Sequence, residues 1–126
     1  MEFQAKIDNE IKEMKKVQSE IQTLAQAKQA LGEKKHENEL VKQEFELLEE
    51  GAVIYKLVGP ILSKQDTAEA KNNVDKRLEF LEKEINRTNT LLKDFEKKME
   101  AKRVSIMKIQ ESFKAKMMQA QQMQQN

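Results

Sequence analysis

The stretch that decides the fold is residues 52–65, which read AVIYKLVGPILSKQ. Two short runs rich in β-branched, aliphatic and aromatic residues flank Gly59 and Pro60, a dipeptide that favours a turn. The sequence therefore predicts a β-hairpin with Gly59 and Pro60 at its turn. A two-stranded hairpin is only marginally stable alone in water, and its strands present unpaired edges. We expect these strands to pair with strands of other chains, because nothing else in the sequence resembles a strand.

The composition around the hairpin is that of long helices. Of 126 residues, 36% are charged and 38% hydrophobic, while only three are Gly and one is Pro. A chain with so few turn formers cannot make the many corners of a sandwich, a barrel or a doubly wound sheet. The expected fold is mainly α: a long antiparallel two-helix coiled coil whose helices are joined by the single β-hairpin.

The first helix is predicted over residues 1–50 and is expected to end at Gly51. Its apolar residues recur at steps of three and four, as on one face of a coiled-coil helix. The stripe weakens near Gly32, and one continuous helix is favoured over two helices broken there. The stripe consists of Phe3, Ile7, Ile11, Met14, Val17, Ile21, Leu24, Leu31, Val41, Phe45 and Leu48.

The second helix is predicted over residues 67–121, after a hairpin segment of residues 51–66. Asp66 and Glu69 have the spacing of a capping box. The helix carries two heptad series, and sustained heptads are a strong coiled-coil signal. One series is Leu78, Ile85, Leu92, Met99, Ile106, Phe113 and Ala120, and the other is Val74, Leu81, Thr88, Phe95, Lys102, Ile109, Lys116 and Met123. The Gln-rich residues 122–126 are expected to form a disordered tail.

If the two helices lie antiparallel, residues whose numbers add to about 117 should face each other in the coiled coil. Leu24 then meets Phe95, and Ile7 meets Ile109 or Phe113. The two stripes match without adjustment, which favours pairing within one chain.

The same sequence lacks the residues that most enzymes and metal sites need. There is no cysteine, the single histidine, His36, lies in a polar stretch, and three glycines cannot build a phosphate-binding loop. We expect no catalytic residue, no metal site, no cofactor and no enzymatic activity. The net charge of +1 gives no broad reason to bind nucleic acid or a membrane. With no signal-peptide pattern and no apolar run of about 20 residues, the chain is expected to be cytoplasmic.

The end of the coiled coil away from the hairpin allows two interpretations. Apolar residues of both helices meet there, close to the helix ends: Phe3, Ile7, Ile11, Ile109, Phe113, Met117 and Met118. They are either the last turns of an ordinary seam or an apolar groove that holds an unfolded segment. Methionine suits the second role because its flexible side chain adapts to different partners.

The hairpin and its flanks resemble the β-type subunits of prefoldin. The resemblance rests on residues 54–65, IYKLVGPILSKQ, on 37–48, ENELVKQEFELL, and on 69–81, EAKNNVDKRLEFL. It implies that the hairpin contributes to a β-barrel shared between subunits, in a hexamer of two α-type and four β-type subunits. The side chains expected to carry this assembly are Val53, Tyr55, Leu57, Val58, Ile61 and Leu62.

The resemblance also implies what the assembly does. Prefoldin captures unfolded proteins such as actin and tubulin at its coiled-coil tips and delivers them, without ATP, to the cytosolic chaperonin. The seven apolar residues at the helix ends would then bind the client. The alternative function is that of a homodimeric coiled-coil scaffold. The apolar hairpin favours the assembly subunit, because a scaffold has no need of unpaired β-strands.

Overall fold

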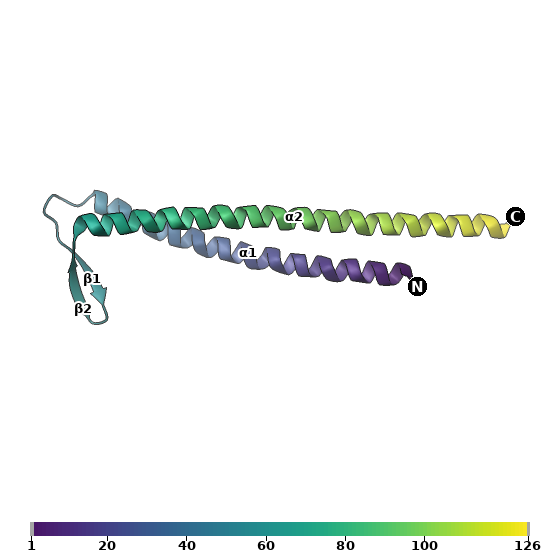
Figure 1. Cartoon of the computed structure of the whole chain (residues 1–126), viewed down its shortest axis with the longest axis horizontal. Coiled ribbons are helices and arrows are strands. Elements are labelled where there is room, and N and C mark those ends of the chain that lie inside the picture. The colour runs from purple at the N-terminus through teal and green to yellow at the C-terminus, as the bar shows by residue number, and fades with distance from the viewer. Residues whose placement is uncertain (1, 126) are drawn as a thin grey trace. The chain divides into compact units, whose positions relative to one another are not determined.

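The chain folds into two long helices and one hairpin, and the computed structural model describes residues 2–125. Helix α1 spans Glu2–Glu46, strand β1 Ile54–Val58, strand β2 Ile61–Gln65 and helix α2 Thr67–Gln125 (Figure 1). This arrangement confirms the predicted mainly α fold. Helix α1 is continuous through Gly32, so the alternative of two helices broken at that residue is not realised.

The connection from α1 to β1 differs from the expectation. Helix α1 ends at Glu46, where its last turn tightens: the N–H of Leu47 donates to the carbonyls of both Gln43 and Glu44 at 3.2 Å. Gly51 lies five residues further on, with φ of 88°, inside a turn closed by the bond from the Ala52 N–H to the Glu49 carbonyl. Its positive φ therefore serves this turn rather than the cap of the helix.

Helix α2 begins as the sequence predicts. One carboxylate oxygen of Asp66 accepts hydrogen bonds from the N–H groups of Ala68, at 2.9 Å, and Glu69, at 3.4 Å. These bonds satisfy two of the donors that a helix leaves open at its start. At its other end the helix continues to Gln125, so residues 122–125 are helical where the sequence suggested a disordered tail. Gln and Met are good helix formers, which explains the continuation.

The hairpin has the register that a two-residue turn imposes. Val58 pairs with Ile61, Leu57 with Leu62 and Ile54 with Gln65. Gly59 has φ of 59° at the first turn position, and Pro60 follows at the second. A left-handed residue followed by one fixed near −65° matches the twist of the two strands, which explains why this dipeptide stands here.

The chain divides into two compact units. One contains α1 up to Ala25 together with α2 from Thr90 onward, and its buried side chains include Ile7 and Met99. The other spans Gln26–Asn89 and buries Val74, Leu81 and Thr88.

Contacts between the helices confirm the antiparallel pairing. Within the first unit, Phe3 stacks on Phe113 and Glu13 pairs with Lys102. Within the second, Lys42 Nζ lies 3.0 Å from a carboxylate oxygen of Asp75, and the hydrogen bond and charge of Asp75 raise the pKa of Lys42. The residue numbers of these three pairs add to about 116, close to the expected sum.

The predicted stripe of α1 needs correction at Ile11, Val41 and Leu48. Val41 is 38% exposed, and Leu48 lies beyond the end of α1 at Glu46. Ile11 is 39% exposed, and the seam position beside it is taken by Glu10, whose side chain is 17% exposed. Steps of three and then four residues from Ile7 lead to Glu10 and Met14. The regular heptad spacing therefore places Glu10 in the seam, although its neighbour Ile11 is apolar.

Candidate functional site

An open groove lies where the start of α1 meets α2, and we call it the tip groove. Its apolar floor is formed by Phe3, Ile109 and Phe113, and its volume is about 240 Å³. The rings of Phe3 and Phe113 are stacked, with centroids 3.9 Å apart and planes inclined by 17°. This stacked pair joins α1 to α2 at the floor of the groove. Helix α2 continues past the start of α1, so within residues 2–125 no helix lies beside its last turns (Figure 1).

The seven residues predicted to bind a client do not all lie together. Phe3, Ile109 and Phe113 share the groove, whereas Ile7 is only 8% exposed and belongs to the core of the unit. Ile11 lies outside the seam. Met117 and Met118, on the continuing part of α2, are 49% and 57% exposed.

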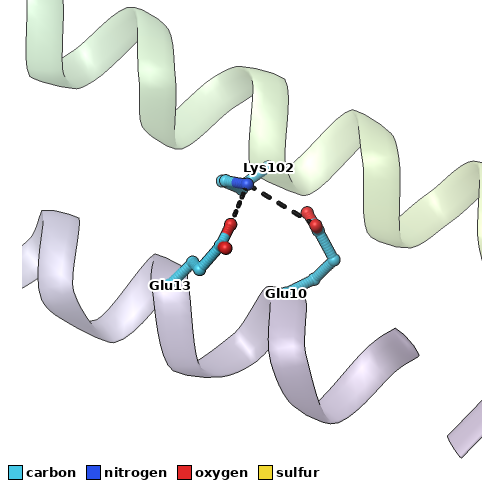
Figure 2. Close-up of polar contacts among 3 residues, drawn as sticks. All are labelled: Glu10, Glu13 and Lys102. Atoms are coloured by element: carbon cyan, nitrogen blue, oxygen red, sulfur yellow. Dashed lines mark hydrogen bonds and ion pairs between the residues drawn. The ribbon is translucent and has the colours of Figure 1, made fainter. Parts of the chain in front are cut away.

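Packing in the same unit creates a charged cluster that the sequence analysis did not identify. Lys102 of α2 reaches between Glu10 and Glu13 of α1 and donates to a carboxylate oxygen of each (Figure 2). The distance from Lys102 Nζ to Glu10 Oε1 is 3.5 Å, and the side chain of Lys102 is 28% exposed. The other oxygen of Glu10, Oε2, is buried and has no hydrogen-bond partner among residues 2–125.

The cluster changes the titration of two of its members. The hydrogen bond from Lys102 and its charge hold the pKa of Glu13 below its usual 4.5. The hydrogen bond to Glu13 likewise raises the pKa of Lys102 above its usual 10.5, against a smaller opposing effect of desolvation. Both shifts favour the charged forms of Glu13 and Lys102, so their ion pair is present at neutral pH.

A charged cluster in an apolar seam favours one register of the helices. A shift of one heptad would place Lys102 against Phe3 and Lys6 in one direction, or Val17 and Glu20 in the other. Either shift removes at least one of its carboxylate partners, and a partly buried charge without a partner is costly. The cluster therefore opposes sliding of α1 along α2 beside the tip groove.

The hairpin carries the largest group of exposed apolar side chains. The residues predicted for assembly are all exposed: Val53 49%, Tyr55 58%, Leu57 67%, Val58 57%, Ile61 67% and Leu62 64%. The register places Tyr55, Leu57 and Leu62 on one face of the hairpin and Val58 and Ile61 on the other. Each strand pairs along one side only within residues 2–125, so both outer edges remain free.

Other kinds of site find no support in the described part of the chain. No group of three or more metal-ligating side chains occurs within residues 2–125. His36 is exposed on α1. Neither described helix has an apolar stretch sufficient to cross a membrane.

Comparison with known proteins links the hairpin and the helices to one family. The family model described as prefoldin subunit matches residues 8–126. The chain belongs to the prefoldin subunit family. Prefoldin subunit 6 of Arabidopsis thaliana is 42% identical over 110 residues, which cover 87% of this chain and 85% of the relative. Prefoldin subunit 6 of Homo sapiens is 33% identical over 111 residues, or 88% and 86% of the two chains.

Solved structures show the same fold. The crystal structure of the prefoldin beta subunit from Thermococcus strain KS-1 superposes with a TM-score of 0.77, covering 82% of this chain and 90% of the other, at 23% identity. The prefoldin beta2 subunit from the same strain gives a TM-score of 0.63 at 20% identity, over 73% of this chain and 98% of the other. Two helices joined by one hairpin are thus the fold of the beta-type prefoldin subunit.

The family assignment decides between the functions that the sequence left open. Prefoldin subunits are non-enzymatic chaperone components, so the chain is a chaperone subunit and its partners include other prefoldin subunits. The alternative of a homodimeric scaffold does not agree with this assignment.

Proposed function

We propose that this chain is a β-type subunit of a prefoldin hexamer that captures unfolded proteins in the cytosol. In this proposal its tip groove holds an apolar segment of the client, such as nascent actin or tubulin, until the cytosolic chaperonin accepts it. No ATP is needed, because capture relies on burial of apolar surface alone.

One observation carries the proposal: the tip groove is open and its floor is apolar. Phe113 is 40% exposed, and Met117 on the next turn of α2 is 49% exposed. Full burial of a large apolar side chain is favourable by about 1.5–3 kcal/mol, so roughly 0.6–1.5 kcal/mol is still to be gained at each of these partly exposed residues. An unfolded client offers such cover, and weak contacts at several tips of a hexamer add up through avidity.

The hairpin supports the assembly part of the proposal. Its free edges and two apolar faces suit strand pairing with α-type and β-type subunits in a shared barrel. Leu57 and Leu62, which face each other across the strands, are both about two-thirds exposed in the isolated chain. We propose that the face bearing Tyr55, Leu57 and Leu62 points into the barrel. Each face carries one lysine, but Lys64 lies near the end of β2 on this face, whereas the other face has Lys56 with Ser63 at its centre.

The experiment compares two double variants in reconstituted hexamers. Phe113→Ser with Met117→Ser changes the tip groove and the turn beside it. Phe80→Ser with Met107→Ser removes the same residue types at positions that are 61% and 52% exposed and do not line the groove. Light scattering of a refolding client should show partial loss of protection with the first pair only, since other tips still hold the client. Equal curves for both variants, with hexamers intact by native mass spectrometry, would contradict capture at this groove.

A further inference from the structure

The rim of the tip groove is strongly basic, although the chain as a whole is nearly neutral. Three lysines line the groove around its apolar floor, Lys6 from α1 and Lys108 and Lys116 from α2, against a single carboxylate, Glu2. We propose that the tip groove selects client segments in which acidic residues flank an apolar side chain. This inference rests on the capture function proposed above and names the class of segment captured.

The lysines of this rim are not engaged within the chain. All three are exposed, and none forms an ion pair among the residues that the structure describes. Elsewhere in the same unit the helices do pair their charges, as Lys102 does with Glu10 and Glu13. The net charge of the whole chain is only +1, so the excess at the groove is local.

The sequence next to the groove extends the same charge pattern. From Ser112 to the end of the chain there is no Asp or Glu, while Lys114 and Lys116 are both present. Glu2, in the first turn of α1, interacts favourably with the positive end of that helix. A bound segment therefore meets a rim with an excess of positive charge, three lysines against Glu2, around aromatic rings.

The size and chemistry of the groove fit a short segment of chain. Its volume of about 240 Å³ lies below the ~300–1,000 Å³ of pockets that hold small molecules. It suits one or two apolar side chains of an extended peptide. Each lysine ammonium offers three hydrogen-bond donors on a flexible stem, so carboxylates at varied distances from the apolar residue can reach one.

A photo-crosslinking experiment on the hexamer tests the inference. Because the chain has no cysteine, Gln110→Cys provides a single thiol in this chain, next to Ile109 but not among the residues that line the groove. The variant chain is labelled with benzophenone before the hexamer is reconstituted. Three fluorescent peptides share the same apolar residues and differ only in four flanking residues: Asp, Ser or Lys. At about 50 mM salt the Asp peptide should be labelled about fivefold more than the Lys peptide. At about 500 mM salt the difference should fall below about twofold, because salt screens exposed charges.

Charge reversal supplies the matched comparison. Lys6→Glu, Lys108→Glu and Lys116→Glu together should invert the preference. Reversing Lys15, Lys93 and Lys97, three exposed lysines outside the groove, changes the net charge equally and should leave the preference in place.

The pattern of labelling distinguishes failure of the charge inference from failure of the capture function. If the Ser peptide is labelled but the Asp and Lys peptides do not differ at low salt, the charge inference is wrong and capture stands. A preference that the groove reversal leaves unchanged likewise overturns it. If no peptide is labelled, both proposals fail. A crosslinked product with the mass of two copies of this chain, formed in place of peptide adducts, would assign the groove to a second copy instead.

Discussion

Replacing Leu57 by Asp should abolish assembly of the chain with other prefoldin subunits while leaving its helices intact. Leu57 is 67% exposed on the hairpin, so about 1–2 kcal/mol of the ~1.5–3 kcal/mol available from burying a leucine is still to be gained. Aspartate forgoes that gain, and burial of its unpaired carboxylate costs several kcal/mol more. A combined loss of about 4 kcal/mol weakens the strand interface about a thousandfold.

Native mass spectrometry of chains reconstituted with their partner subunits measures this loss. Leu47→Asp is the matched control, because Leu47 is 83% exposed between α1 and the hairpin and belongs to neither strand. Circular dichroism should show the same helix content in both variants, since neither residue is part of the seam. Hexamers that form equally well with Leu57→Asp would refute assembly through this face of the hairpin.

Three further predictions concern stability. Leu81→Ala, at a position only 6% exposed, should lower the free energy of unfolding by about 2–3 kcal/mol. In the same urea titration Leu91→Ala, at a position 36% exposed, should lower it by less than about 1 kcal/mol. Equal losses would contradict the placement of Leu81 in the seam. Glu13→Gln should lower the unfolding temperature relative to wild type, and this difference should persist from about pH 6 to about pH 9. Below about pH 4 the difference should vanish, because Glu13 is protonated there, below its lowered pKa, and loses its ion pair with Lys102. A difference independent of pH would argue against this role of Glu13. Gly59→Ala should destabilise the hairpin by about 1 kcal/mol through the positive φ of 59°, and unchanged hydrogen exchange in the strands would show that the turn tolerates a side chain.

The parts of the fold that follow short-range rules could be predicted from the sequence. Heptad spacing located the seam of α2, the dipeptide Gly59-Pro60 located the hairpin turn, and Asp66 located the start of α2. Each of these signals acts within one or two turns of the chain, where residue type and backbone geometry are directly linked.

Helix ends were harder to place. Helix α1 stops at Glu46 although Leu47 and Leu48 continue an apolar pattern, because bonds in the last turn, not the hydrophobic stripe, decide where a helix closes. Helix α2 passes residue 121 because nothing in its Gln-rich end breaks a helix, even without packing.

The charged features of the tip required knowledge of both helices at once. Part of the charged cluster can be detected in the sequence. Lys102 is a polar residue in a mostly apolar heptad series. Facing residues have numbers that add to about 117, which places Lys102 opposite the part of α1 that contains Glu10 and Glu13. The cluster is not predicted, however, because the predicted stripe of α1 contains the apolar Ile11 in place of Glu10. The basic rim was harder to find in the sequence, because Lys6 lies on α1 whereas Lys108 and Lys116 lie on α2, and each alone resembles an ordinary solvated side chain.

The charged cluster and the tip groove have opposite physical requirements, and the chain places them a few helical turns apart. The proposed capture of clients needs an apolar surface that stays uncovered, and such a surface costs stability and lets helix ends fray or slide. Lys102, held by Glu10 and Glu13, opposes sliding because a shift of one heptad in either direction removes at least one of its two carboxylate partners. The stacked rings of Phe3 and Phe113 depend on that same register, since a shift of one heptad would separate them. A polar cluster in the seam thus allows the chain to keep its groove both exposed and in a defined shape.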